Sequence, residues 1–277
     1  MAGGGLTAVP AFFCVTCGAQ YPPTDEPPPA CAICADPRQY VGWAGQTWTT
    51  PDELRAGHTA ELREEEPGLL GIGMAPSFAI GQRALLVPGG GGGVLWDCIP
   101  LVDDEIVGAV EARGGLRAIA ISHPHYYTGM VEWSRALGGV PVHLHAADAE
   151  WITRPDPAVE LWEGDALDLG EGVTLVRLGG HFPGATVLHW AMGAGGRGSL
   201  LSGDVVQVVP DRRWVSFMWS YPNYVPLPAA EVRRIAGALE PWAFERIHGA
   251  WWGLGVAEDG AGAVRRSAER YVRALGG

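Results

Sequence analysis

Two histidines with the spacing of a metal-binding pair follow an apolar segment of the chain. Residues 116–121 read Leu-Arg-Ala-Ile-Ala-Ile, which predicts a buried strand, and His123 and His125 come directly after it. Because side chains alternate across a strand, residues two positions apart point to the same side. Two imidazoles on one side of a strand exit can bind the same metal ion. The spacing therefore indicates a metal site at this end of the strand.

Four of the five cysteines form two closely spaced pairs near the N-terminus, Cys14 with Cys17 and Cys31 with Cys34. Each pair can bind a metal ion from one tight turn, and four thiolates complete a tetrahedral site. A proline-rich spacer predicts a stiff loop between the pairs. A segment of about 40 residues buries too little apolar surface to fold alone, so a metal supplies the missing stability. The pattern resembles a zinc ribbon or a rubredoxin-type knuckle. We expect structural zinc, with a redox iron as the alternative.

Three further polar residues lie in glycine-containing loops or at strand ends. His181 is part of the loop Gly-Gly-His-Phe-Pro-Gly that begins at residue 179. Asp204 ends the apolar segment Leu-Leu-Ser-Gly-Asp, and His248 lies within Ile-His-Gly. A histidine in a loop between strands is well placed to be a metal ligand, and a strand-end carboxylate can join it.

The ordered set of motifs resembles the signature of the metallo-β-lactamase superfamily. The first motif of that family reads His-x-His-x-Asp-His; here the two histidines match, whereas Tyr127 and Thr128 replace the Asp and the last His. The Gly-His, Gly-Asp and terminal His-Gly motifs of the family match at His181, Asp204 and His248. Asp97 stands where the family has an aspartate that supports the ligand loop.

This resemblance covers residues 69–275 and implies the fold. We expect an α/β (α+β) protein, a four-layer αββα metallo-β-lactamase sandwich at residues 41–277. A small zinc-ribbon-like unit with the four cysteines precedes it, at residues 1–40.

The resemblance also implies a metal site and its chemistry, with the ligands His123, His125, His181 and Asp204. Of the residues that usually hold a second ion only Asp204 and His248 remain, so we expect one metal ion, either zinc or Fe²⁺. Asp204 is expected to orient a water or to act as general base. His248 is expected to stabilise an oxyanion or to protonate the leaving group, and Tyr127 to donate a hydrogen bond to the substrate.

Aromatic residues close to these motifs predict the wall of a substrate pocket, made of Trp219, Tyr221, Tyr224 and Trp251. An apolar, aromatic wall favours an uncharged or aromatic small molecule. A place in the core or in an oligomer contact is the alternative for these side chains.

The function expected from these residues is hydrolysis of an ester, thioester, lactone or amide by a metal-activated water. Two alternatives stay open. The first is a non-haem iron oxidoreductase of the persulfide-dioxygenase type, with His123, His181 and Asp204 as its facial ligands. The second is a metal-stabilised binding or scaffold protein without catalysis.

The pattern of apolar residues and breakers predicts alternating strands and helices, which is typical of layered α/β structure. The expected strands are 46–49, 78–80, 84–87, 94–96, 116–121, 140–144, 166–178, 186–190 and 199–201. The expected helices are 51–63, 103–113, 130–137, 228–239 and 261–275. The run Glu64-Glu65-Glu66 is expected to be a solvated surface.

Composition excludes several classes of function. The net charge is −12, and all 19 basic residues are arginine, without a basic run. Such a chain is a poor candidate for nucleic-acid binding, which requires neutralisation of phosphates. Apolar runs are too short for a membrane span, and residues 1–5 lack the positive start of a signal peptide. We therefore expect a cytoplasmic protein without membrane or nucleic-acid partners, and a homo-oligomer is left open.

Overall fold

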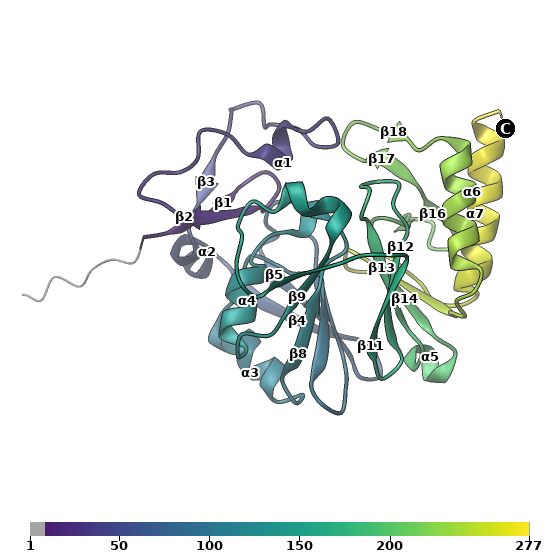
Figure 1. Cartoon of the computed structure of the whole chain (residues 1–277), viewed down its shortest axis with the longest axis horizontal. Coiled ribbons are helices and arrows are strands. Elements are labelled where there is room, and N and C mark those ends of the chain that lie inside the picture. Colours follow the sequence, from purple (N-terminus) through teal and green to yellow (C-terminus); the bar gives the residue numbers. More distant parts are fainter. Residues whose placement is uncertain (1–8, 277) are drawn as a thin grey trace, which may run out of the picture.

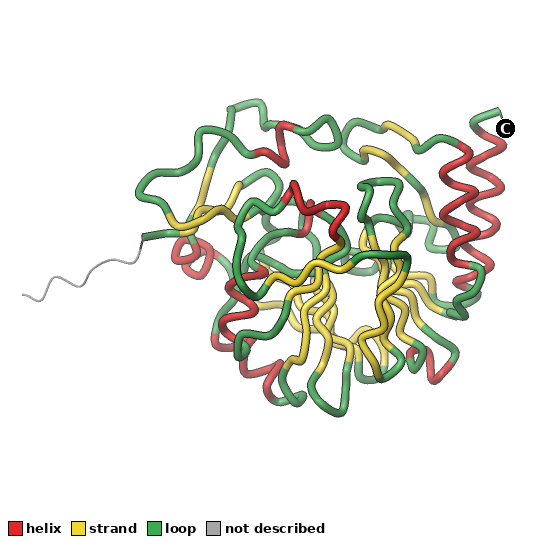
Figure 2. Tube along the Cα trace, in the orientation of Figure 1, coloured by secondary structure: helices red, strands yellow, loops and turns green. Residues whose placement is uncertain are grey.

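The computed structural model describes residues 9–276, and its main body consists of two large β-sheets that face each other, with helices on the outside (Figures 1 and 2). The N-terminal residues used above to argue against a signal peptide lie outside this range. No helix in residues 9–276 is long and apolar enough to cross a membrane.

The first sheet has seven strands in the order β10-β9-β8-β7-β6-β5-β4. The pairs β7–β8, β8–β9 and β9–β10 are parallel, whereas the pairs β4–β5, β5–β6 and β6–β7 are antiparallel. Their bounds are β4 Thr59–Glu66, β5 Leu69–Ala75, β6 Ala84–Val87, β7 Gly93–Trp96, β8 Leu116–Ala120, β9 Val142–His145 and β10 Val159–Trp162.

The second sheet has six strands in the order β11-β12-β13-β14-β19-β20. All neighbours pair antiparallel except β14 and β19, which are parallel. Their bounds are β11 Ala166–Gly170, β12 Val173–Arg177, β13 Thr186–Trp190, β14 Ser199–Gly203, β19 Arg246–Gly249 and β20 Gly255–Val256.

Three apolar layers separate four layers of secondary structure. On β8, Ala118 and Ala120 face the second sheet and pack in one cluster with Leu188 and Leu201. Ile119, between them, belongs to a different cluster that also contains side chains of α3 Asp104–Glu111 and α4 Met130–Ala136. This is the alternation expected of a strand that is buried on both faces.

The second sheet is covered on its outer face by two helices, α6 Ala229–Leu239 and α7 Gly260–Ala274 (Figure 1). Val232 and Ile235 of α6 and Val264 of α7 pack in one cluster with residues of β12, β14 and β19. The helix–sheet–sheet–helix layers confirm the predicted αββα fold class.

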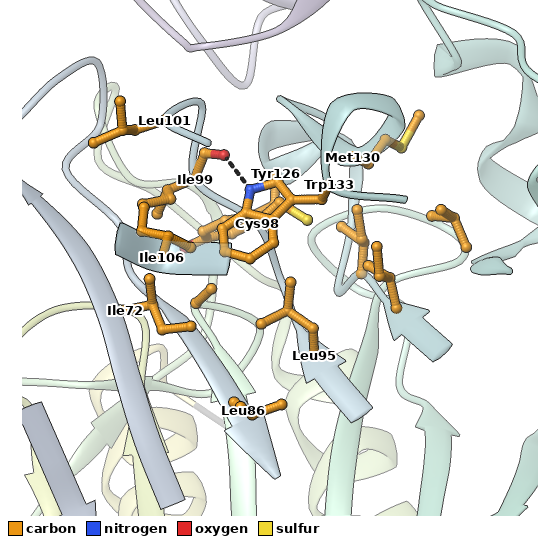
Figure 3. Close-up of a cluster of buried hydrophobic side chains, with 14 of the residues drawn as sticks. Ile72, Leu86, Leu95, Cys98, Ile99, Leu101, Ile106, Tyr126, Met130 and Trp133 are labelled. Carbon is orange, nitrogen blue, oxygen red and sulfur yellow. Dashed lines mark hydrogen bonds between the residues drawn. The ribbon is translucent and has the colours of Figure 1, made fainter. Parts of the chain in front are cut away.

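Figure 3 shows the core between the first sheet and its helices. Trp133 of α4 is fully buried among apolar side chains, and its indole N–H donates to the carbonyl oxygen of Ile99 at 2.8 Å. Since a buried indole N–H without a partner would be costly, this hydrogen bond allows the large ring to fill the core.

A small unit precedes the sandwich, and we call residues 11–49 the cysteine knuckle. Its sheet has the order β2-β1-β3, and a short helix, α1, carries the second cysteine pair. The third strand comes from beyond the boundary that we place after residue 40. The bounds are β1 Ala11–Cys14, β2 Gln20–Pro23, α1 Ala32–Ala35 and β3 Trp48–Thr49.

The remaining elements are short and lie in the connections. They are the helices α2 Pro51–Gly57 and α5 Gly193–Gly196, the 3₁₀ turns η1 Pro124–Tyr126 and η2 Ala146–Trp151, and the strands β15 Gln207–Val208, β16 Val215–Ser216, β17 Met218–Ser220 and β18 Val225–Pro226.

The helix predicted over residues 51–63 was wrong in its second half. It begins as expected, because Thr50 and Glu53 form a capping box, but it ends at Gly57. The following residues form β4, which pairs with β5 along its length. Ala60 and Leu62, two positions apart, pack against the helix-side core. Pairing with β5 therefore overrides the local helix preference.

Three smaller predictions were also wrong. The segment 166–178, expected to be one strand, forms the antiparallel pair β11 and β12 with a turn at residues 171–172. Residues 78–80 form a turn and not a strand, because Ala79 has a φ of 51°, outside the range of extended backbone. The run Glu64-Glu65-Glu66 is not wholly solvated, because Glu66 is buried between the sheets and bonds to Ser199.

Replacement of Trp133 by alanine tests the helix-side core. We expect Trp133→Ala to lower the free energy of unfolding by about 3–5 kcal/mol, since it leaves a cavity and an unpaired carbonyl. Trp43→Ala is the matched control: Trp43 is fully exposed, and its loss should change stability by less than about 0.5 kcal/mol. Urea denaturation measures both, and equal effects would contradict this description of the core.

Candidate metal centre

Four buried side chains from three loops meet at one end of the sandwich. His123 and His125 flank the start of η1, in the loop that follows β8. His181 lies in the loop between β12 and β13, and Asp204 follows β14 directly. One ligand atom of each residue lies within 4.8 Å of the ligand atoms of the others. The structure thus brings together the four predicted metal ligands.

The potential ligand atoms of this cluster are oriented toward one another, and only some of them are paired. His125 Nδ1 lies 3.1 Å from His181 Nε2, and His123 Nε2 lies 3.2 Å from Asp204 Oδ1. His123 Nε2 and Asp204 Oδ1 are buried and have no hydrogen-bond partner among the described residues. Buried polar atoms of native proteins are nearly always paired. Converging nitrogen and oxygen lone pairs of this kind fit a divalent metal ion.

Hydrogen bonds on the outer side of the rings hold two of the imidazoles. Ser122 Oγ lies 3.0 Å from His123 Nδ1, and the backbone N–H of Ser122 donates to Asp97 Oδ1 at 2.8 Å. His181 Nδ1 lies 2.8 Å from the carbonyl oxygen of Trp219, to which it can only donate. This fixes the tautomer with a free lone pair on Nε2, as outer-sphere partners of metal ligands commonly do. Asp97 therefore supports the ligand loop, as the resemblance implied.

Electrostatics of the cluster favours a cation. Burial lowers the pKa of His123 and His125 well below the ordinary value and that of His181 to about 4, so the imidazoles are neutral at pH 7. Burial, assisted by the charge of Asp97, raises the pKa of Asp204 to about 8. Neutral imidazoles are the form that binds a metal, and a cation beside Asp204 would stabilise its carboxylate.

The four cysteines of the knuckle form a second cluster with metal-binding geometry. All four are buried free thiols. Sγ of Cys14 lies 3.5 Å from Sγ of Cys34, and Sγ of Cys17 lies 3.6 Å from Sγ of Cys31. With metal–sulfur bonds of about 2.3 Å, a tetrahedral zinc site separates its sulfurs by about 3.8 Å. The arrangement fits a four-thiolate metal site.

The pKa of each of these thiols depends on its hydrogen bonds with the neighbouring thiols. Hydrogen bonds from the other thiols, that of Cys17 first, lower the pKa of Cys14, and the same pairing raises the pKa of Cys17. The side-chain amide of Gln46 also donates to Cys14 Sγ, at 3.1 Å. A divalent cation is needed for all four sulfurs to be thiolates at once.

The cysteine knuckle lies across the end of the sandwich that carries the metal ligands (Figure 1). Arg38 donates to the carbonyl oxygen of His181 at 3.2 Å, and its guanidinium lies 3.7 Å from the ring centroid of Phe182. The carbonyl oxygen of Arg38 accepts a hydrogen bond from Ser220 at 3.0 Å. The histidine ligands and Asp204 are between 1% and 5% exposed. The knuckle is thus part of the wall around the metal centre.

His248 is not brought into this cluster. It lies on β19 beside Leu201, three residues before Asp204 on the neighbouring strand. Its Nε2 lies 3.2 Å from Glu66 Oε1, and Glu66 also binds Ser199 and Arg246. The predicted ligand or acid is therefore engaged in a buried ion-pair network between the sheets.

Tyr127 and Thr128, the residues at the altered motif positions, are buried at the contact with the knuckle. The carbonyl oxygen of Tyr127 lies 3.5 Å from the backbone nitrogen of Gln20. A Cβ atom on Gly18 would lie 3.5 Å from Thr128 Oγ1. Neither residue belongs to the group of converging ligands in the described part of the chain.

A different tyrosine, Tyr126, is the one beside the metal ligands. Its ring centroid lies 4.7 Å from that of His123 in an edge-to-face arrangement. Its hydroxyl is buried and has no hydrogen-bond partner among residues 9–276. Burial raises its pKa, and the charges of Asp204 and Asp97 raise it further, so the hydroxyl is protonated at pH 7. No sequence signal distinguished Tyr126 from Tyr127, because the 3₁₀ turn that orients them is a product of the loop.

Of the predicted pocket residues, two lie beside the metal ligands. Trp219 supplies the carbonyl that holds His181, and the hydroxyl of Tyr221 donates to the carbonyl oxygen of Asp204 at 2.7 Å. Trp251 instead donates to the carbonyl oxygen of Ile80 and packs against the helix-side core. Tyr224 is 85% exposed at the surface. These four side chains therefore do not form one wall.

Comparison with known proteins identifies one relative by sequence and several proteins of similar fold. No protein-family model matches the chain. The uncharacterized protein YmaE of Bacillus subtilis (strain 168) is 45% identical over 269 residues, which are 96% of this chain and 97% of the relative.

Several solved metallo-β-lactamases are similar in structure. DIM-1 is 13% identical with a TM-score of 0.56, and covers 76% of this chain and 97% of its own. FIM-1 from Pseudomonas aeruginosa, solved in a mono-zinc form, is 15% identical with a TM-score of 0.56, over 77% of this chain and 96% of its own. A motif mutant of the Cronobacter sakazakii enzyme is 20% identical with a TM-score of 0.52, over 79% and 96%. At these identities the likeness establishes the fold.

The buried pairing of Glu66 predicts a pH-dependent stability. Burial alone would raise the pKa of Glu66, but hydrogen bonds from His248 and Ser199 outweigh it and lower the pKa to about 2. Because the unfolded value is about 4.3, the stabilisation is complete above about pH 5 and is lost as the pH falls toward 2.

We expect Glu66→Gln to lower the free energy of unfolding by about 3 kcal/mol at pH 7, and the difference to shrink below about pH 4. Glu64→Gln, on the exposed side of the same strand, is the control and should stay within about 0.5 kcal/mol. Denaturation curves recorded between roughly pH 3 and pH 7 measure both variants, because the contribution of Glu66 to stability changes in this range. A constant difference at every pH would contradict the assigned pairing.

Proposed function

This chain belongs to the protein family of Bacillus subtilis YmaE and has the metallo-β-lactamase fold, and on that premise we propose that it is a metal-dependent hydrolase. The proposed reaction is hydrolysis of an ester, thioester, lactone or amide of a small molecule. The observation that carries the proposal is the convergence of three neutral imidazoles and one carboxylate, with unpaired buried donor atoms, at one end of the sandwich.

Zinc is the proposed ion in both clusters, with Fe²⁺ as the alternative among the histidines. His123 and His181 would bind it through Nε2 and His125 through Nδ1, the atoms that converge. An ion held there would supply Lewis acidity, which polarises a carbonyl and makes a coordinated water acidic.

A single ion at this centre is part of the proposal. In the described residues, Asp204 forms a group of converging potential ligands with the three histidines alone. His248 is engaged by Glu66, and Tyr127 and Thr128 are poor ligands at the contact with the knuckle. Two-metal chemistry clamps both the attacking and leaving oxygens of a phosphodiester, so the proposal disfavours such substrates.

The side chains around the ligands supply the proton chemistry. Asp204 is the carboxylate positioned to orient an attacking water and to accept its proton. Tyr126 holds a proton on its unpaired hydroxyl and would donate a hydrogen bond to the oxygen on which charge develops. In this proposal Tyr126 takes the role that we first expected of Tyr127.

A non-haem iron oxidoreductase is the second candidate, and the burial of the ligands favours it. With exposures between 1% and 5%, the ligand side chains are more accessible to a diatomic co-substrate such as O₂ than to an ester. Two histidines and a carboxylate are the ligand set of such sites, and a third histidine is present here.

The direct test is a substrate panel of esters, thioesters, lactones and amides, assayed with zinc-loaded and iron-loaded protein. We expect turnover with zinc, and a loss of at least about 100-fold in kcat with Asp204→Asn. Oxygen consumption with iron and no hydrolysis would favour the second candidate. Unchanged turnover in Asp204→Asn at unchanged metal content would remove the proposed role of Asp204.

A pair of tyrosine variants separates the two candidate donors. We expect Tyr126→Phe to lower kcat by about 10–100-fold with little change in KM, because the lost hydrogen bond acts on developing charge. Tyr127→Phe keeps the backbone contact with the knuckle and should leave kcat within about twofold of the parent. The reverse order of effects would return the role to Tyr127.

A further inference from the structure

The segment directly after the second cysteine pair crosses from the knuckle to the metal centre. We call residues 36–39 the strap. Asn223, in the loop between β17 and β18, donates through its side chain to the carbonyl oxygens of Pro37, at 2.9 Å, and Gln39, at 3.2 Å. Ser220 donates to the carbonyl oxygen of Arg38 at 3.0 Å. Only Ala35 separates the strap from Cys34, so a metal that orders the cysteine also orders the start of the strap.

Arg38 is the side chain of the strap that reaches the ligand loop. The carboxylate of Asp36 accepts hydrogen bonds from Arg38 Nε at 2.6 Å and from Arg38 Nη2 at 3.0 Å, which fixes the plane of the guanidinium. Nη1 donates to the carbonyl oxygen of His181, and the same group lies over the ring of Phe182. A bidentate ion pair leaves Arg38 little rotational freedom, so its contact with the His181 loop is well defined.

The other side of the knuckle rests on the altered positions of the first motif. Gly18, with a φ of 82°, brings the turn between the first cysteine pair and β2 against Thr128, where a larger side chain would also crowd Ala79. The Tyr127 carbonyl faces the backbone nitrogen of Gln20, whose side-chain amide donates to Glu132 at 3.2 Å. The positions that carry an Asp and a His in the superfamily motif are here the surface on which the knuckle docks.

Docking of the knuckle on the sandwich depends on metal binding by its four cysteines. A unit of this size folds only when a metal satisfies its thiolates, so loss of that metal removes the ordered strap. His181 would then lose the donor on its carbonyl and the cation over its neighbouring ring, and the ligand cluster would open to water. Any effect of one metal on the affinity for the other is reciprocal by thermodynamic necessity.

We propose that the cysteine knuckle is a metal-dependent lid of the histidine centre, and that Arg38 is the positioning residue that transmits its state to His181. Filling the four-cysteine site raises the affinity of the histidine centre, and filling the histidine centre raises the affinity of the cysteines by the same factor. The coupling requires only that both clusters bind metal, so it can fail or hold independently of the hydrolase proposal.

The experiment uses the full-length chain stripped of metal and measures Co²⁺ binding by its absorption spectrum. Cd²⁺ first fills the four-cysteine site, because soft thiolates prefer it, and Co²⁺ is then titrated into the histidine centre. We expect Cd²⁺-loaded protein to bind Co²⁺ at the histidine centre about tenfold more tightly than Cys34→Ser protein without Cd²⁺.

Arg38→Gln, with the cysteine site filled, should weaken Co²⁺ binding at the histidine centre by about tenfold and change the Co²⁺ spectrum there. The thiolate–metal absorption of the cysteine site should stay the same, which separates a positioning role from general unfolding. Arg135→Gln is the matched control, since Arg135 pairs with Asp156 at the surface and contacts neither cluster. It should bind Co²⁺ as the parent does.

If Cys34→Ser fails to fold, the same coupling can be measured in the other direction, as the effect of the histidine centre on Cd²⁺ binding. In the unmodified chain, loading the histidine centre should raise the Cd²⁺ affinity of the cysteines by the factor measured in the other direction. Equal Cd²⁺ affinity with the histidine centre empty and filled would overturn the proposal. Parent-like Co²⁺ affinity and spectrum in Arg38→Gln would overturn the role of Arg38.

Discussion

The structure depends on one electrostatic constraint: lone pairs of buried nitrogen and oxygen atoms that converge in a dry interior are stabilised by a cation between them. Three imidazoles and Asp204 are held in that arrangement by loops at one end of the sandwich. Outer hydrogen bonds between His123 and Ser122, and from His181 to the carbonyl oxygen of Trp219, fix two of the rings. The stability that the sandwich gains from its apolar layers holds the ligand loops in this arrangement.

The same constraint operates a second time in the knuckle, where four buried sulfurs need a cation to be thiolates together. The two clusters are joined through the strap, since Arg38 contacts the His181 loop. The knuckle docks where the superfamily motif is altered, at Tyr127 and Thr128. The two positions at which this sequence differs from the motif are therefore also part of the surface on which the knuckle docks.

The sequence was sufficient for the features that depend on local spacing. The His-x-His and Cys-x-x-Cys pairs and the strand-end Asp204 lead to clusters that the structure assembles. Alternating strands and helices led to the right fold class. The predictions that were wrong concern features that depend on partners far away in the sequence. Strand β4 forms because β5 pairs with it. Glu66 is buried because it forms hydrogen bonds with Ser199 and His248 of the other sheet. No local pattern marks such pairings, nor the choice of Tyr126 over Tyr127 or the reach of Arg38.

The central claim is that one metal ion binds among His123, His125, His181 and Asp204 and a second among the four cysteines. Anomalous diffraction from crystals of the full-length protein, recorded at the absorption edge of the bound metal, tests it most directly. The account predicts one peak within bonding distance of each cluster and none beside Tyr127, Thr128 or His248. A second peak next to Asp204, or no peak among the histidines in protein kept with metal throughout, would contradict it.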